Sequence, residues 1–566
     1  MLLEEANPVR NWPNFLDNPI IVKFRGQSIK PRRRNSGVPT ISVLLPVVLG
    51  AALSAGCHDK PDLDASLRRA LGGEPSSLDP ANAADSFSSE VIRDLYEGLT
   101  TESPSGQVAP AAALGWSVDI SGTEYTFRLR PSGRWSNGEP VRANDFVAAW
   151  RREVDPKTAS PMADNLRLIG HAGAILEGKE PPTALAVAAA SDFVLVVKLE
   201  RPAPYFPQIL ANPSMAPIYS KAAIGSHFPS QWVSNGPYVL ETWTPNAEIK
   251  LKANENYWDR QNVKIEHVRY SFIADESTQY ARYRAGELDM TDTVPANVLP
   301  EIRSEHPHEL VIAPRLATAY YGFNLANSVV SSLPLRQALT MAINRPYLVK
   351  TLGLGQLPAF GFVPPGTASY TPQSWDWQSL SDGARVAEAR RLYRQAGFTP
   401  ASPLHLRVLL NNNEVIRRTA VLIAAMWKET LGVDVELNSE EYKVFLESRH
   451  DTSRWDVARL AWTADYNDAG NFLEILRTKS ANNDMNYTNP ALDEALNDAA
   501  ATADNSRRRE DLQNSERLVL RDYPIVPLYF FVTKRLVKPY VHGVAITPLG
   551  SLPSKVLSIA RGQNAM

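Results

Sequence analysis

The sequence predicts an α/β protein divided into two or three lobes. At 566 residues, the chain is longer than a single hydrophobic core normally supports. Residues 125–130, 193–199 and 249–252 alternate apolar and polar side chains, which is the period of half-buried strands. Residues 334–344 and 417–431 instead carry apolar side chains at helical spacing. Strands and helices are therefore mixed along the chain, and a chain of this length can form a large cleft.

Turn-forming residues mark the limits of both predicted helices. Pro334 suits the first turn of a helix because its φ angle is already fixed near the helical value. Gly432 follows the second helix, where a glycine is a common C-terminal stop. After Asp59, no apolar run is long enough to span a membrane, and no repeat of 20–50 residues is evident.

The composition argues against nucleic acid and anionic membrane surfaces as partners of the whole chain. Lys and Arg total 59 and Asp and Glu total 61, so the net charge creates no strong field of one sign. A 44% hydrophobic content with 43 prolines is typical of a folded protein rich in loops. Twelve tryptophans suit aromatic-lined pockets, although core packing alone would use many of them.

The only cysteine, Cys57, follows a segment with the features of a secretion signal. Lys30 and residues 32–34 are basic, and residues 38–53 form an apolar run that is short for a transmembrane helix. The ending Leu53-Ser54-Ala55-Gly56-Cys57 resembles a bacterial lipobox, in which the cysteine is lipidated. We therefore expect residues 1–57 to be a signal region and Cys57 to carry a lipid anchor. A signal anchor, or a buried helix with an idle thiol, is the alternative.

Motifs for catalysis or cofactor binding are weak. Residues 173–179 match a phosphate-binding loop until Glu180, which replaces the hydroxyl side chain that should reach magnesium. His306 and His308 flank a proline and lack the helical spacing of a zinc protease. Acidic pairs such as residues 440–441 are ordinary surface charge by default. We expect no cofactor, no metal and no enzymatic activity.

Asp465 is the one acidic residue in unusual surroundings, because it follows Trp462 and precedes Tyr466 in a segment that begins beside Arg459. Local sequence leaves two interpretations. The aspartate is either a structural cap or a ligand for a cation. Asp465 and Asp468 could also be imagined as a general acid and base, like residues 440–441, but their spacing alone does not distinguish them from surface charge.

The segment of residues 457–467 resembles the peptide-site strand and loop of oligopeptide-binding proteins. These belong to the solute-binding family that also includes dipeptide, murein-peptide and nickel binders. Landmarks in the same order cover about residues 68 to 545. They are residues 74–80, 95–99, 135–147, 235–238, 256–259, 282–290, 320–324, 336–339 and 525–529.

The resemblance implies two hinged lobes of the periplasmic-binding-protein type with an additional inserted domain. Lobe I would comprise residues 62–105, 226–322 and 531–566. Residues 106–225 would form the inserted domain II, and residues 323–530 would form lobe III. The implied mechanism is closure of the lobes around a ligand, without any bond being broken.

The implied function is capture of short peptides outside the cytoplasm and their delivery to the permease subunits of an ABC transporter. The protein would act as a monomer, in the periplasm or cell envelope, held to a membrane by the lipid. By analogy, Asp465 would pair with the peptide α-ammonium and Arg459 with a carboxylate at one peptide length. The implied peptide-binding residues are Asp465, Arg459, Trp462, Thr463, Ala461, Tyr466 and Asn467.

Two departures from the family pattern concern the peptide carboxylate. Some relatives place a histidine at the position of Ile416 and a lysine near residues 351–353, where this chain has neither. Arg417 and Arg418 lie next to the first of these positions. A narrower length preference or a modified peptide, such as a murein peptide, is therefore an alternative. A metal chelate, haem or opine is a further alternative ligand, which the presence of both Asp465 and Arg459 disfavours.

Overall fold

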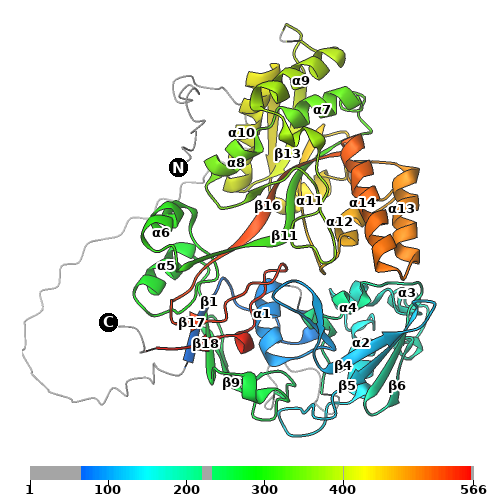
Figure 1. The fold of residues 1–566 in the computed structure, drawn as a ribbon, viewed down its shortest axis with the longest axis vertical. Coiled ribbons are helices and arrows are strands. Elements are labelled where there is room, and N and C mark those ends of the chain that lie inside the picture. Colours follow the sequence, from blue (N-terminus) through cyan, green and yellow to red (C-terminus); the bar gives the residue numbers. More distant parts are fainter. Residues whose placement is uncertain (1–65, 84, 220–231, 400, 562–566) are drawn as a thin grey trace, which may run out of the picture.

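The computed structural model describes residues 66–83, 85–219, 232–399 and 401–561, and it has the mixed α/β architecture that the sequence predicts. Cys57 and the rest of the expected signal region lie outside the described residues. Three sheets of four or more strands organise the chain, and two of them lie in the lower half of Figure 1. Within the described part of the chain, no helix is both long and apolar enough to cross a membrane.

The first sheet joins a strand near the amino end of the described chain to a later meander. Its strand order is β1-β10-β9-β8, with β1 parallel to β10 and the other pairs antiparallel. Its core includes Leu67, Val91 and Val268. The elements of this part are β1 (Ser66–Leu71), α1 (Ser86–Leu95), β8 (Tyr238–Thr244), β9 (Glu248–Ala253), β10 (His267–Phe272), α5 (Glu276–Arg284) and α6 (Leu299–Glu305).

The second sheet is antiparallel, with strand order β4-β5-β7-β6. Phe127 and Leu195 from this sheet share a core with Phe146 and Trp150 of α2. The predicted strands at residues 125–130 and 193–199 are confirmed as β5 and β7. The elements of this part are β2 (Thr100–Glu102), β3 (Val108–Pro110), β4 (Ala113–Val118), β5 (Glu124–Leu129), α2 (Ala143–Glu153), α3 (Ala172–Leu176), β6 (Val187–Ser191), β7 (Val194–Lys198) and α4 (Phe206–Ile209).

The third sheet has six strands in the order β12-β16-β11-β15-β13-β14 and lies in the upper half of Figure 1. Its strands are β11 (Leu310–Phe323), β12 (Leu357–Pro358), β13 (His405–Asn411), β14 (Asp434–Glu440), β15 (Val457–Thr463) and β16 (Ile525–Leu536). Helices cover both of its faces, because the apolar side chains of alternate strand positions belong to two separate cores.

The helices of this part fall into two groups. One face packs against α7 (Leu333–Met341), α8 (Arg345–Leu352), α9 (Asp382–Gln395) and α10 (Glu414–Leu431). The other packs against α11 (Tyr442–Ser448), α12 (Gly470–Leu473), α13 (Pro490–Ala501) and α14 (Asn505–Asp522). Both predicted helices are confirmed, as α7 and α10. Gly432 ends α10 with a φ of 81°, a left-handed conformation that favours glycine.

Two long strands, β11 and β16, connect the third sheet to the first (Figure 1). One end of their ladder pairs Leu310 with Leu536, beside the first sheet, where Met290 bridges to Val537. The other end pairs Gly322 with Ile525 inside the third sheet. The register shifts between Pro314 and Thr318, so the two halves of the ladder are not continuous. A small two-stranded sheet, β17 (Val541–His542) with β18 (Ser558–Ile559), completes the described fold.

Candidate functional site

Strand β15 presents the residues that the sequence singles out. Its side chains alternate, so Arg459, Ala461 and Thr463 share one face, and Leu460 and Trp462 lie on the other. Along the first face the strand changes from a half-buried Arg459 to an exposed Ala461 and Thr463. The carboxyl-terminal half of β15 therefore opens toward a space between the sheets.

Asp465 lies in the loop just after β15 and is held there by Asn471 of α12. The Asn471 amide nitrogen donates to Asp465 Oδ2 at 3.4 Å, and the Asp465 backbone N–H donates to Asn471 Oδ1 at 3.3 Å. The Trp462 indole N–H donates to the same Asn471 oxygen at 2.9 Å. Spacing alone gives no signal for this role of Asn471, because it depends on how α12 packs beside the strand.

The carboxylate of Asp465 does not cap a helix, which removes one of the two interpretations of its local sequence. The cap position of α12 is Ala469, without a side-chain hydrogen bond. Among the described residues, none places a cationic group within ion-pair distance of Asp465. Burial raises the pKa of the Asp465 carboxyl, since the surrounding protein removes water that would stabilise its charge. A cation from outside the chain would relieve this cost.

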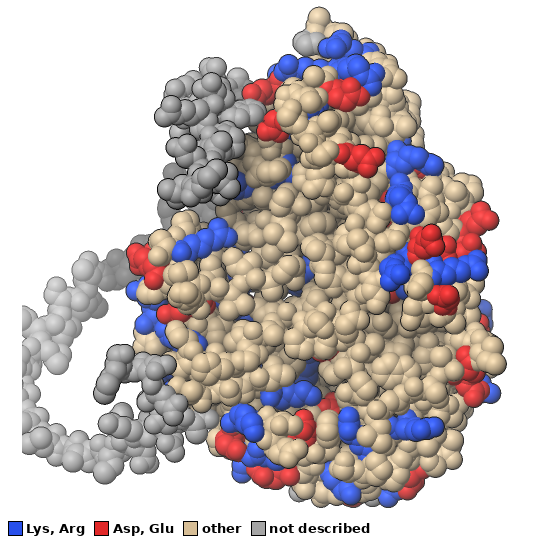
Figure 2. Space-filling model, in the orientation of Figure 1, with Lys and Arg blue, Asp and Glu red and all other residues tan. Residues whose placement is uncertain are grey.

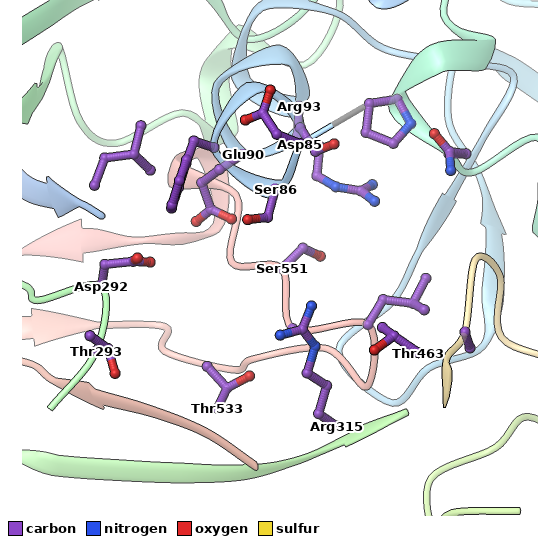
Figure 3. Close-up of a pocket in the computed structure, with 18 of the residues that line it drawn as sticks. Asp85, Ser86, Glu90, Arg93, Asp292, Thr293, Arg315, Thr463, Thr533 and Ser551 are labelled. Carbon is purple, nitrogen blue, oxygen red and sulfur yellow. The ribbon is translucent and has the colours of Figure 1, made fainter. Parts of the chain in front are cut away.

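A cavity of about 500 Å³ lies beside Asp465 and receives side chains from every part of the fold (Figure 3). Helix α1 supplies Glu90 and Arg93, and β11 supplies Arg315 from the opposite side. Further walls come from β16, from the turn around Ser551 and from residues 463–465. A space of this volume between separate parts of the fold is typical of a small-ligand site.

The other predicted residues divide into those near the cavity and those that hold the loop. Thr463 lines the cavity with Asp465. Tyr466 instead stacks on Tyr205, with ring centroids 5.5 Å apart and an interplanar angle of 8°. Asn467 is buried, where its amide donates to the Gly106 carbonyl at 2.8 Å and accepts the Ala368 N–H at 2.7 Å. The structure thus places Tyr466 and Asn467 in contacts that join distant segments, not on the cavity wall.

Arg459 lies at the other end of the β15 face, opposite Tyr321 of β11. It has no carboxylate partner within ion-pair distance in the described part of the chain. Arg459 and Asp465 are six residues apart, which corresponds to about 20 Å in an extended strand. Among the described residues, β15 therefore carries a cation without an ion-pair partner, Arg459, and is followed in the loop by an anion without one, Asp465.

Asp468, unlike Asp465, has a cationic partner and several hydrogen-bond donors. Its carboxylate accepts two hydrogen bonds from Arg508, at 2.6 and 2.8 Å, and one from the Gly470 N–H at 2.8 Å. Asp468 is therefore committed to structure, and the two aspartates do not form an acid and base pair. Glu440 likewise pairs with Arg454, and Glu441 caps α11.

The remaining motifs of the sequence have structural explanations. Residues within the phosphate-loop match form α3, whose Ile175 is buried, whereas a phosphate-binding loop precedes its helix. No group of three or more potential metal ligands occurs among the described residues. Ile416, at the position where the family resemblance implied a histidine in some relatives, packs into the core. Arg417 is exposed and pairs with Glu414, and the exposed Arg418 donates to the Thr351 carbonyl at 2.7 Å.

Comparisons with known proteins agree with this architecture. The family model of bacterial extracellular solute-binding proteins, family 5, matches residues 107–484. The periplasmic oligopeptide-binding protein OppA of Salmonella typhimurium is 36% identical over 546 residues, 93% of this chain and 100% of that protein. The periplasmic murein peptide-binding protein MppA of Escherichia coli is 36% identical over 487 residues, 85% of this chain and 90% of that protein.

Solved structures give the same result in three dimensions. The unliganded open form of MppA, a periplasmic murein tripeptide-binding protein, has a TM-score of 0.82 at 34% identity, covering 87% of this chain and 97% of that one. The complex of Haemophilus influenzae OppA with the peptide RPPGFSPFR has a TM-score of 0.69 at 33% identity, covering 88% of this chain and 99% of that one. The chain therefore belongs to family 5 of the bacterial extracellular solute-binding proteins.

Proposed function

We propose that this protein binds short peptides in the cavity beside β15 and delivers them to the permease subunits of an ABC importer in the periplasm. The observation that carries the proposal is a pair of opposite charges, Arg459 on β15 and Asp465 in the loop after it, neither with an ion-pair partner among the described residues. A zwitterionic ligand, such as a peptide, has an ammonium for Asp465 and a carboxylate for Arg459. The mixture of both charge signs on the face drawn in Figure 2 fits a small-solute binder better than a nucleic-acid binder.

The peptide would lie extended along the face of β15. Its α-ammonium would pair with Asp465, and its main chain would hydrogen-bond to the backbone of Ala461, Trp462 and Thr463 as an added strand. Arg459 would meet the terminal carboxylate of a peptide of one particular length. That length is set by the backbone separation of about 20 Å between Arg459 and Asp465, shortened by the reach of their two side chains. Specificity for side chains would then come from the walls of the cavity, and no bond need be broken.

Closure of the lobes would bury the bound peptide. The lobes would comprise the residues proposed from the sequence, with lobe I at 62–105, 226–322 and 531–566, domain II at 106–225 and lobe III at 323–530. The interrupted β11 and β16 ladder at Pro314 supports a hinge there. The TM-score is higher for the unliganded open form of MppA than for the peptide complex of OppA, at nearly equal identity and coverage, which supports an open arrangement here.

A murein peptide is the second candidate ligand. The similarity to MppA in sequence and in structure favours it, and such a peptide also carries an ammonium and several carboxylates. Mass spectrometry of the ligands that co-purify with the protein from its own periplasm would separate the candidates. Ordinary peptides contain only α-linked residues, whereas murein peptides contain γ-linked glutamate.

The role of Asp465 tests the proposal directly. Asp465→Asn should weaken peptide binding by about a hundredfold to several thousandfold, because removal of one partner of a buried charge pair costs about 3–5 kcal/mol. Isothermal titration calorimetry with tri-, tetra- and pentapeptides measures the effect. Asp498→Asn on α13, where the side chain is exposed, is the matched control and should change affinity by less than about 1 kcal/mol.

N-acetylated peptides give the reciprocal measurement, since they remove the charge from the ligand. They should bind the unsubstituted protein poorly and should lose little more on Asp465→Asn. Near-normal affinity for Asp465→Asn, or equal affinity for free and acetylated peptides, would contradict the assignment.

The lipid anchor at Cys57 is a separate part of the proposal. Removal of residues 1–56 would leave Cys57 as the first residue, where acyl chains would hold a monomeric binding protein at a membrane surface. Cys57→Ser should abolish the attachment of acyl chains and leave the chain unprocessed, with residues 1–56 retained. Unchanged processing and fractionation would refute the anchor without affecting the peptide site.

A further inference from the structure

The cavity beside Asp465 contains more unpaired positive than negative charge. Arg93 of α1, Arg315 of β11 and Lys534 of β16 line it, and none has an ion-pair partner within the described ranges. Arg93 donates to the Ala211 carbonyl at 3.1 Å, and Lys534 donates to the Val294 carbonyl at 3.3 Å. Both acceptors are neutral carbonyls, so neither cation has a carboxylate within ion-pair distance among the described residues, although Glu90 and Glu102 act on Arg93 and Glu276 acts on Lys534 over longer distances.

The acidic residues on the same walls are mostly occupied. Glu90 binds Arg535 at 3.2 Å and also pairs with Arg69, and Asp292 lies 3.6 Å from Arg535. Asp85 caps α1, where its carboxylate accepts hydrogen bonds from Ser76 and Ser88. Asp465 is the lining carboxylate that has neither a cation nor a helix N-terminus as its partner among the described residues.

Arg315 is the cation in the most unusual environment. Its Nε atom is buried and has no hydrogen-bond partner among the described residues. Burial lowers the pKa of the guanidinium, and Asp292, the carboxylate that opposes this effect, is already bound to Arg535. Figure 3 shows Arg315 rising from β11 into the cavity, toward the side where Ser551 lies. An unpaired guanidinium in such a position is suited to a carboxylate from a ligand.

Arg315 and Asp465 line the same cavity. The Ala464 N–H donates to the Leu316 carbonyl at 2.8 Å, which extends the β11 and β15 ladder one residue past Thr463. Arg315 precedes Leu316 and Asp465 follows Ala464, so the backbones of both residues lie at the same end of the ladder. They nevertheless form no ion pair with each other. A ligand that fills this cavity can therefore meet both Arg315 and Asp465.

We propose that the preferred ligand is a peptide with a carboxylate on its first or second residue, and that Arg315 is the side chain that recognises this carboxylate. The inference rests on the proposed function, because Asp465 must hold the peptide ammonium to set the register. Arg93 and Lys534 add positive charge to the same cavity and disfavour a basic residue at that point. The carboxylate belongs either to an α-linked Asp or Glu or to the free α-carboxyl of a γ-linked glutamate.

The test compares two nearly isosteric peptides, Ala-Glu-Ala and Ala-Gln-Ala, by calorimetry on the full chain after removal of bound ligand. The ratio of their dissociation constants should favour the glutamate peptide by about tenfold to a hundredfold, as expected for a charge-assisted hydrogen bond. Arg315→Met should bring this ratio close to one, and Arg315→Lys should retain part of it. Arg417→Met, at an exposed position on α10, is the matched control and should leave the ratio unchanged.

Each result separates this inference from the peptide function itself. Equal affinity of the unsubstituted protein for both peptides overturns the role of Arg315 while leaving peptide binding intact, and this measurement requires no variant. A preference that survives Arg315→Met also overturns it. Failure of both peptides to bind overturns the peptide function and the inference together. A third peptide, Ala-γ-D-Glu-Lys, identifies the source, since tighter binding than Ala-Glu-Ala supports the γ-linked carboxylate and weaker binding the α-linked one.

Discussion

The carboxyl of Asp465 is expected to make peptide binding depend on pH. Burial raises its pKa in the free protein, and only the ionised form attracts an ammonium. Affinity should therefore fall as pH decreases through this raised pKa, at a higher pH than for an ordinary aspartate, and binding near that pH should release a proton. Calorimetry in two buffers of different ionisation enthalpy measures the release. The Asp465→Asn variant should show none, and a pH-independent affinity in the unsubstituted protein would refute the expectation.

Glu153 on α2 is a second carboxyl with a raised pKa, and its effect is on stability. The side chain is 1% exposed, its Oε1 has no described hydrogen-bond partner, and burial and the nearby charge of Asp79 raise its pKa well above the usual value. Between its unfolded and folded pKa values, the folded state retains a proton that the unfolded state releases. The free energy of unfolding therefore falls as pH rises through this range.

Glu153→Gln removes this dependence and should raise the free energy of unfolding at pH 7 by about 1–3 kcal/mol. The gain should shrink toward pH 4, where the unfolded carboxyl is also largely protonated. Urea unfolding at both pH values measures the change, and Glu494→Gln at an exposed position of α13 is the control. A loss of stability at pH 7 would show that the ionised carboxylate has a favourable partner.

At the scale of secondary-structure elements, α14 supports the loop that precedes α9 through one buried side chain. Glu516 is fully buried, and its carboxylate accepts the N–H groups of Phe362 and Val363, both at 2.8 Å, and of Gln373 at 2.9 Å. The Tyr370 hydroxyl donates to it at 2.7 Å. The helix thus satisfies three backbone donors that the loop itself leaves unpaired.

Glu516→Ala should lower the free energy of unfolding by about 2–4 kcal/mol, because these donors would remain buried without an acceptor. Urea unfolding followed by tryptophan fluorescence measures the loss. Glu510→Ala lies on the exposed side of the same helix and should change stability by less than about 0.5 kcal/mol. Similar effects of the two substitutions would mean that the loop does not depend on Glu516.

At the scale of the whole molecule, ligand binding and shape are interdependent because α1, β11, β16 and the loop after β15 all line one cavity. A peptide that contacts both Asp465 and α1 binds the closed form more tightly than the open one. Small-angle scattering should show a smaller radius of gyration with saturating peptide. Peptide at a hundred times its Kd should also stabilise the folded state by about 2.7 kcal/mol. Asp465→Asn at the same peptide concentration is the control, and identical scattering profiles of the unsubstituted protein would contradict closure.

The sequence alone determined the features that depend on neighbouring residues. The alternation at residues 125–130 and the helical spacing at 417–431 identify β5 and α10, since strand and helix periods are properties of consecutive side chains. The proline and glycine at the helix limits act through their own backbone preferences. The family resemblance, carried by ordered motifs, identified the peptide-binding class and led to the proposal that the segment containing Asp465 forms the site.

The tertiary structure alone decided which side chains converge on that segment. Asn471 holds Asp465 because α12 folds back beside β15, and Arg315 approaches from a strand 150 residues earlier in the chain. Tyr466 and Asn467 have the same local surroundings in sequence as Asp465, yet they pack against Tyr205 and Gly106. The physical reason is that side-chain convergence depends on the packing of distant elements, for which the local periodicity of a sequence carries no information.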